Sequence, residues 1–235
     1  TSHTVAVVDM SGSMRTDDVD GARCRSDGVW GAVARDVVAG PFRRGERGPS
    51  DVVSVVTMGD VADVRIRHEP TTWVLYNRLA DLAEWTAARP GGHGNYMPAL
   101  DAAAGLLGIG AGNGRCAMAL VFFSDGRPSD AGGDFAGAVG RLAARFGRRL
   151  SVTCIGMARG CSEDFSVLHE MVEEARRYGS AARFGAPSLE AGAISSLVSA
   201  LATSVTGQKS ELTEAGPGGD RQREVRSDIL RERRG

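Results

Sequence analysis

The sequence has a single lysine, Lys209, and no hydrophobic run of the length that a membrane helix needs. Its longest apolar stretches, such as Cys116–Phe123, fall far short of the roughly 20 residues that cross a bilayer. The 28 lysine and arginine residues are balanced by 29 acidic residues, which leaves a net charge of -1. A balanced chain has no global attraction for nucleic acid or for an anionic membrane surface. We therefore expect neither as a partner.

Cysteine is also scarce, and the four cysteines form no CxxC pair. Cys116 and Cys154 lie in apolar, strand-like runs, where a thiol acts as a small hydrophobic side chain. Because disulfides need an oxidising compartment, we expect a reduced, intracellular and cytoplasmic protein. The N-terminal stretch "TSHTVAVV" has neither a basic region nor a long apolar region, so we expect no signal peptide and a chain cut from a longer protein.

Strand-like and helix-like segments alternate along most of the chain. Thr4–Asp9 and Asp51–Met58 are rich in valine, as expected for strands that are covered on both faces. After the turn at Gly59–Asp60, the stretch "VADVRIRHEP" alternates apolar and polar residues and predicts a hairpin partner at the sheet edge. Further strands are predicted in "CAMALVFFSDG", in "RLSVTCIGM" and near 182–184, and helices at 27–38, 73–88, 98–107, 134–146, 164–178 and 189–205.

This order predicts an α/β fold with a doubly wound, mostly parallel central sheet, one antiparallel edge strand and helices on both faces. The apolar periodicity stops at Gly207. We therefore predict an ordered domain over residues 1–206 and a flexible, charged linker or tail over 207–235. Within that tail, "REVRSDILRERRG" is either solvated or a short charged helix that leads to another domain.

Two carboxylates follow predicted strands, and two serines follow the first of them. In a parallel sheet the binding crevice lies beyond the carboxyl ends of the strands, where Asp9 and Asp125 are expected. Ser11 and Ser13, separated by Gly12, are able to direct both hydroxyls to one point. Mg²⁺ prefers oxygen ligands and usually keeps several waters, so a site with few carboxylates and several hydroxyls suits it.

The segment "DMSGSM" after a valine-rich strand resembles the D-x-S-x-S motif of the von Willebrand factor A domain. The later "FFSDG" and "GGHGNYMPAL" are similar to two further elements of that family, in the same order. The resemblance covers about Thr4 to Val205. It implies a Rossmann-like domain with a metal-ion-dependent adhesion site, which binds Mg²⁺ or Mn²⁺ and uses it to grip an acidic residue of a partner protein. Asp9, Ser11, Ser13 and Asp125 match the family's metal positions.

The third element departs from the family at Gly94, which stands where a threonine is usual. Asn95 offers a carbonyl oxygen as a replacement ligand, or it caps the following helix. His93 is either a rim residue or a solvated loop residue, because imidazole suits Zn²⁺ or Cu²⁺ better than Mg²⁺. We therefore expect Asn95 as a further metal ligand and place His93 and Gly94 on the partner-binding rim.

Three acidic residues, Asp17, Asp18 and Asp20, lie in an insertion after the serine loop. Their spacing resembles a calcium loop, but a glutamate at the twelfth position is missing. They are either a second cation site or a solvated loop that borders the first site, and we place them on the partner-binding rim.

These observations favour a metal-dependent protein-interaction module over an enzyme. One alternative is a metal-free scaffold that has lost the ion through Gly94. Another is a Mg²⁺-dependent phosphoryl-transfer enzyme with Asp9 as nucleophile, which generally needs a second acid two positions on, where Ser11 stands, and a well-placed lysine. A serine hydrolase is disfavoured because neither serine lies in a G-x-S-x-G motif. A P-loop is disfavoured because no lysine follows "GRPSDAGGD".

Overall fold

The computed structural model describes residues 1–46, 48, 50–86, 90–109, 112–158, 164–187 and 189–214. Its centre is a six-stranded sheet with the strand order β3-β2-β1-β4-β5-β6. The strands are β1 (Ser2–Asp9), β2 (Val52–Met58), β3 (Ala62–Pro70), β4 (Ala117–Ser124), β5 (Leu150–Gly156) and β6 (Ala181–Gly185). All neighbours pair in parallel except β2 and β3, which form the antiparallel hairpin at the edge. The predicted fold class is confirmed.

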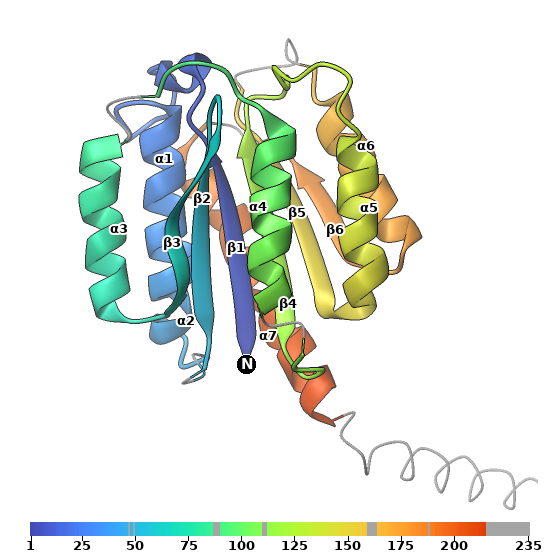
Figure 1. Ribbon diagram of the computed structural model, residues 1–235. Helices are drawn as coiled ribbons and strands as arrows, with labels where there is room; N and C mark the ends of the chain where they lie inside the picture. Colours follow the sequence, from blue (N-terminus) through green and yellow to red (C-terminus); the bar gives the residue numbers. More distant parts are fainter. Residues whose placement is uncertain are drawn as a thin grey trace, which may run out of the picture.

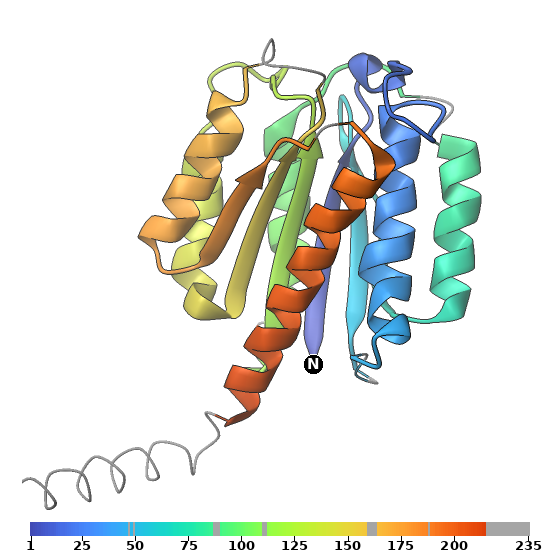
Figure 2. The same ribbon diagram turned by 180° about the vertical axis from the view of Figure 1, so that it is seen from behind.

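Helices cover both faces of the sheet, as Figures 1 and 2 show from opposite sides. On one face lie α4 (Tyr96–Ile109), α5 (Phe135–Phe146) and α6 (Ser166–Arg177). On the other lie α1 (Arg25–Ala32), the π-helical segment Val33–Ala39, α2 (Gly40–Arg43), α3 (Trp73–Thr86) and α7 (Ala191–Glu214). Short 3₁₀ turns occur at Gly12–Arg15 and Gly147–Arg149.

Alternation along the strands explains the two layers. In β1, Val5 and Val7 pack with α4, while Ala6 and Val8 pack on the opposite face with α1 and α7. Because both faces are covered, all eight residues of β1 are buried, and the same holds for β4. This is the environment in which a parallel strand becomes a continuous apolar run.

The register of the two central strands places their carboxyl ends together. Val8 of β1 lies opposite Phe123 of β4, so Asp9 and Ser124 follow at the same edge of the sheet. Asp125 comes directly after Ser124. Because β1 and β4 pair in parallel, the chain leaves both strands toward the same end of the sheet, which lies at the top of Figure 1.

The last helix is longer than the sequence predicted. α7 continues to Glu214, so the boundary set at residue 206 falls inside a helix and the tail was predicted to start too early. An interior glycine such as Gly207 costs a helix only about 1 kcal/mol, and tertiary contacts compensate. Residues 215–235 lie outside the described residues, so a flexible linker there stays a prediction.

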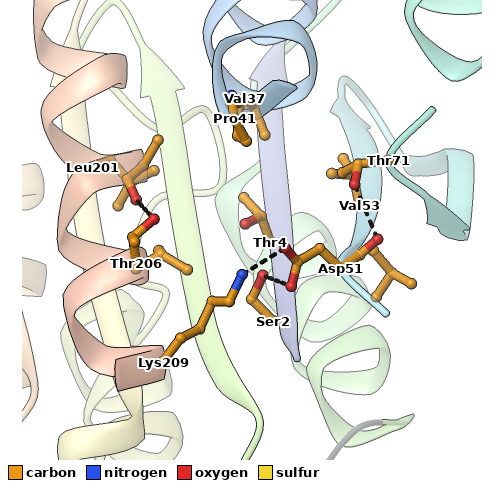
Figure 3. A pocket seen from close by; sticks show the side chains of 13 residues that line it. Ser2, Thr4, Val37, Pro41, Asp51, Val53, Thr71, Leu201, Thr206 and Lys209 are labelled. Carbon is orange, nitrogen blue, oxygen red and sulfur yellow. Dashed lines mark hydrogen bonds and ion pairs between the residues drawn. The ribbon is translucent and has the colours of Figure 1, made fainter. Parts of the chain in front are cut away.

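Lys209 makes one of these contacts (Figure 3). Its Nζ lies 2.6 Å from Oδ2 of Asp51. This oxygen also accepts the Gly48 N–H at 2.7 Å, while Oδ1 of Asp51 accepts the Ser2 hydroxyl at 2.8 Å. This ion pair borders a small cavity of about 40 Å³ between α7 and the start of the sheet. The ion pair ties the end of α7 to the end of the sheet opposite Asp9.

Among the described helices, none is long and apolar enough to cross a membrane.

Candidate metal and partner-binding site

Asp9 is the last residue of β1 and lies almost completely buried, with 1% of its surface exposed. Its Oδ1 accepts the Ser11 N–H at 2.8 Å, and its Oδ2 accepts the Ser124 hydroxyl at 2.7 Å. The Ser124 oxygen in turn accepts the phenolic O–H of Tyr96 at 2.7 Å and the Gly126 N–H at 3.2 Å. A chain of hydrogen bonds therefore runs from α4 through β4 and fixes the carboxylate of Asp9.

The electrostatic setting of Asp9 is unfavourable for a negative charge. Burial, and then the nearby carboxylate of Asp125, raise the pKa of Asp9 to about 6. The hydrogen bonds from Ser11 and Ser124 lower this pKa and offset part of the effect. Burial also raises the pKa of Tyr96 far above its usual value, so its hydroxyl remains a donor. A positive charge placed beside Asp9 and Asp125 would relieve their repulsion.

The serine loop brings two hydroxyls together next to Asp9. Ser11 Oγ lies 3.1 Å from Ser13 Oγ. The loop is anchored from below by Met14, which is fully buried in the core, and from the side by a hydrogen bond from the Gly12 N–H to the Gly92 carbonyl at 3.3 Å. Ser11 is buried and Ser13 is exposed, so the pair leads from Asp9 toward solvent.

The side-chain position of Gly94, which is empty in a glycine, faces Asp9 and Ser11. A Cβ atom built at Gly94 would lie 3.3 Å from Ser11 Cβ and 3.4 Å from Asp9 Oδ1. Its backbone is held by Ser129, which accepts the Gly94 N–H through Oγ at 3.1 Å and donates its own N–H to the Gly94 carbonyl at 2.9 Å. Gly94 is not among the glycines with a positive φ, so other residue types are able to adopt its backbone conformation. The position thus faces the site but contributes no side-chain oxygen.

The residues beside Gly94 are bound to the turn between β2 and β3. The Asn95 side-chain amide donates to the carbonyl of Asp60 at 2.9 Å, and its N–H donates to the carbonyl of Gly59 at 3.1 Å. The His93 N–H donates to Asp60 Oδ1 at 3.0 Å, and the His93 side chain is exposed.

The start of α4 is capped from another loop. Asp130 accepts the N–H groups of Tyr96 and Met97 at 2.8 and 2.7 Å. Capping by Asn95, one of the two roles considered from the sequence, is therefore replaced by Asp130. The other role of Asn95, as a metal ligand, stays a prediction.

Asp125 lies beside an arginine that the sequence analysis overlooked. Arg25 Nη1 is 3.6 Å from Asp125 Oδ2. The same guanidinium makes short contacts with Asp18, through Nε at 2.9 Å to Oδ1 and through Nη2 at 2.7 Å to Oδ2. Both partners of this second ion pair have only 10% of their side-chain surface exposed.

The three acidic residues of the inserted loop do not converge. Asp18 binds Arg25, the Asp20 N–H donates to the Leu189 carbonyl at 2.9 Å, and Asp17 is exposed. In the part of the chain that the structure describes, no three His, Cys, Asp or Glu side chains form a group that could hold a metal ion. The alternative of a second cation site therefore receives no support from the described geometry, and the place of these residues on the partner-binding rim stays a prediction.

A cleft of about 410 Å³ opens beside the serine loop and Asp125. Ser11, Ser13 and Asp125 line one part of it, and Arg25, Arg127 and Ser129 line another. The predicted donors Asp9, Ser11, Ser13 and Asp125 offer oxygen atoms only, which is the donor chemistry that suits Mg²⁺ or Mn²⁺. Two carboxylates and two hydroxyls are able to hold a hard cation without a third acidic group, so this donor set fits Mg²⁺ or Mn²⁺.

No protein-family model and no curated protein matches the sequence, but solved structures match the fold. The SpRpn10 VWA domain matches with a TM-score of 0.61 at 15% identity, over 84% of this chain and 93% of that chain. A von Willebrand factor type A structure from Catenulispora acidiphila matches with a TM-score of 0.60 at 10% identity, over 88% of this chain and 43% of that chain. This chain has a von Willebrand factor A fold.

An aerotolerance-related membrane protein from Bacteroides fragilis shares this von Willebrand factor A fold, with a TM-score of 0.61 and 15% identity over 88% of this chain and 100% of that chain. At these identities the likeness shows the fold alone. Asp9 ends β1, and Asp125 follows the end of the neighbouring strand β4, as the sequence predicted; their role as metal ligands is not tested by this likeness. Metal binding itself stays a prediction.

Sequence reasoning missed several polar residues of the site. Ser124 stands directly before Asp125 at a strand end, and its polarity inside an apolar strand was an available signal. Tyr96 lies within the quoted third element, but its contact with Ser124 joins segments 28 residues apart and has no local signature. The same holds for Arg25, at the start of α1, and for Arg127 and Ser129, in the loop between β4 and α5, which all line the cleft.

Proposed function

We propose that this domain is a protein-interaction module that holds Mg²⁺ or Mn²⁺ in the cleft and uses the ion to bind an acidic residue of a partner protein. Asp9, Ser11, Ser13 and Asp125 are the proposed ligand residues, and Asn95 remains a candidate. A bound divalent cation with few protein carboxylates supplies an electrophilic centre whose remaining positions accept water or an outside carboxylate.

One observation supports this function most strongly. The hydroxyls of Ser11 and Ser13 lie 3.1 Å apart, and the Ser11 main chain is hydrogen-bonded to the buried carboxylate of Asp9. Hydroxyls and carboxylates are thus gathered at one point before any ligand arrives, which lowers the ordering cost of binding. A hard cation would also relieve the repulsion between Asp9 and Asp125.

The rim of the cleft suits an acidic partner. Arg127 is exposed and lines the cleft, so it offers a fork of donors that matches a carboxylate. We propose that His93 and Gly94, together with Asp17, Asp18 and Asp20 of the inserted loop, contribute to partner choice. With a net charge of -1, we propose neither nucleic acid nor a membrane surface as the ligand.

A metal-free scaffold is the second candidate, because Arg25 already places a positive charge near Asp125.

A phosphoryl-transfer enzyme is disfavoured. Both carboxylate oxygens of Asp9 accept hydrogen bonds, which weakens a nucleophile, and Lys209 is paired with Asp51 at the opposite edge of the sheet. We propose that the domain binds without catalysing a reaction.

We further propose an intracellular, cytoplasmic location. Cys116 and Cys154 are free and buried. Burial raises the pKa of the Cys154 thiol to about 12, which keeps it protonated and unreactive. Thiols of this kind suit a reducing compartment.

The function is tested with immobilised domain, wild type and Asp9→Asn, exposed to proteins in Mg²⁺ or Mn²⁺. A true partner is retained by the wild type, released by EDTA and lost with Asp9→Asn. A peptide that copies the partner's contact segment displaces the partner from the domain. The same peptide with its Asp or Glu changed to Asn or Gln does not. Retention that is equal with and without EDTA, and on both forms of the domain, supports the metal-free scaffold and contradicts the proposal.

A further inference from the structure

Arg25 is a buried cation within the wall of the proposed metal cleft. Only 8% of its surface is exposed, and its N–H donates to the Thr16 carbonyl at 3.1 Å, so its backbone is fixed beside the serine loop. The guanidinium faces two carboxylates at once, Asp18 and Asp125. An arginine remains charged at every physiological pH, so this positive charge is permanent.

The two carboxylates hold this guanidinium unequally. Asp18 receives the close contacts, through Nε at 2.9 and 3.2 Å and through Nη2 at 2.7 Å. Asp125 Oδ2 lies farther away, 3.6 Å from Nη1. The arrangement places the fork of Arg25 on Asp18 and leaves Asp125 with a looser ion pair.

We propose that Arg25 is an internal counterion that competes with a divalent cation for Asp125, and that Asp18 sets the strength of this competition by holding the guanidinium back. This inference rests on the proposed function, since it concerns affinity for the same ion. It assigns to the inserted loop a defined task, the tuning of cation affinity, and makes Arg25 and Asp18 positioning residues rather than ligands.

The physical reason is simple electrostatics in a partly desolvated cleft. A guanidinium at 3.6 Å offsets much of the charge that Asp125 would offer to a second cation. If Arg25 is removed, its offset of the Asp125 charge is lost, and Asp125 attracts the ion more strongly. If Asp18 is neutralised instead, Arg25 loses its closest contact among the described residues, and its other carboxylate partner there is Asp125. The two changes should therefore act in opposite directions.

The test is Mn²⁺ titration, followed by calorimetry and by the electron paramagnetic resonance signal of free Mn²⁺. We expect Arg25→Gln to tighten binding about tenfold and Asp18→Asn to weaken it about tenfold, the scale expected for one close charge in a partly desolvated site. Arg67→Gln and Asp81→Asn make the same charge changes at exposed positions that do not line the cleft. Each should shift affinity by less than about threefold, because solvent and salt screen exposed charges.

The double variant Arg25→Gln/Asp18→Asn tests whether loss of the Asp18 charge weakens Mn²⁺ binding directly, without acting through Arg25. Once Arg25 is absent, neutralising Asp18 should no longer weaken binding, so the double variant should bind as tightly as Arg25→Gln alone, within about twofold. Circular dichroism checks that each variant is folded. If Asp18→Asn weakens binding equally in the presence and absence of Arg25, or if Arg67→Gln matches Arg25→Gln, the inference is wrong.

The outcomes separate this inference from the proposed function. If the wild type binds Mn²⁺ and Arg25→Gln binds it no better, the inference fails and the function stands. If the wild type binds no Mn²⁺ while Arg25→Gln does, the proposed function of the native domain fails and the competition by Arg25 is supported. If neither form binds Mn²⁺, both are contradicted.

Discussion

The hydroxyl of Ser124 donates to Asp9 Oδ2 at 2.7 Å and joins the ends of two neighbouring strands across 115 residues of sequence. Because Ser124 also accepts the O–H of Tyr96, it is the central member of a buried, fully hydrogen-bonded chain. Such chains are costly when one member is removed and its partners keep their polar groups. The geometry of the candidate site therefore depends on a serine that is not itself one of the proposed ligands.

Ser124→Ala should destabilise the domain more than Tyr96→Phe. The first change leaves both the Tyr96 hydroxyl and one oxygen of Asp9 without Ser124, which costs roughly 2–3 kcal/mol of unfolding free energy. The second leaves Ser124 with its bonds to Asp9 and to the Gly126 N–H, and costs roughly 1 kcal/mol. Urea unfolding measures both values. Equal losses, or a larger loss for Tyr96→Phe, would show that Ser124 is not the central member.

Gly94→Thr should tighten Mg²⁺ binding relative to Gly94→Ala. The built Cβ points at Asp9 and Ser11, so a threonine hydroxyl adds an oxygen to the proposed site. The Cβ contacts of 3.3 and 3.4 Å require a shift of a few tenths of an ångström, and the alanine variant experiences the same crowding without the oxygen. We expect a gain of about tenfold over Gly94→Ala in calorimetric titration. A threonine variant no better than alanine would contradict this role for position 94.

If Asn95→Ala abolishes binding while Gly94→Thr changes nothing, the asparagine already replaces the missing threonine. The hydrogen bond from the Asn95 amide to the Asp60 carbonyl then orients its oxygen. That outcome would assign the third element to Asn95 instead of Gly94.

Lys209→Met should lower the unfolding free energy by roughly 1–3 kcal/mol, because Asp51 would remain mostly buried without its cation. Glu211→Met is the matched control, since Glu211 lies exposed on the same helix. Burial alone would raise the pKa of Asp51, but hydrogen bonds from Lys209, Gly48 and Ser2 lower it below the usual 3.8. The stabilisation from Asp51 is thus present above that value and lost as the pH falls through the lower folded value. A Lys209→Met variant as stable as wild type at pH 7 would contradict the role of this ion pair.

His3 should make the domain acid-sensitive. Burial, and then the nearby ring of His68, lower the pKa of His3 from 6.5 to about 4. The unfolded chain therefore binds a proton that the folded domain excludes, and stability falls as the pH drops from about 6.5 to 4. The loss amounts to at most about 3 kcal/mol. Asp9 shifts stability in the opposite direction, so the comparison with a variant isolates His3.

His3→Gln keeps a polar atom for Ser54, which lies 2.9 Å from His3 Nε2 in the wild type. The difference in unfolding free energy between wild type and His3→Gln should change by about 2–3 kcal/mol between pH 7 and pH 4. Parallel curves for the two proteins over this range would disprove the effect.

Much of the fold is predictable from local pattern, because the valine-rich runs of β1 and β2 are buried on both faces and the alternating run of β3 lies at an edge. The strand ends then place Asp9 and Asp125 at one edge of the sheet. Long-range ion pairs are a different matter. Neither Arg25 with Asp125 nor Lys209 with Asp51 has a local signature, since each depends on how distant elements pack. For the same reason the end of α7 was placed too early.

The most direct test of the account is calorimetric titration of Mn²⁺ into the wild type and into Asp9→Asn, with circular dichroism to show that both are folded. The proposed site predicts one bound ion per wild-type domain and none in Asp9→Asn, which keeps the size of the side chain but removes its charge. Asp51→Asn, at the opposite edge of the sheet, should keep the wild-type stoichiometry. Stoichiometric binding that survives Asp9→Asn, or its absence from the folded wild type, would contradict the account.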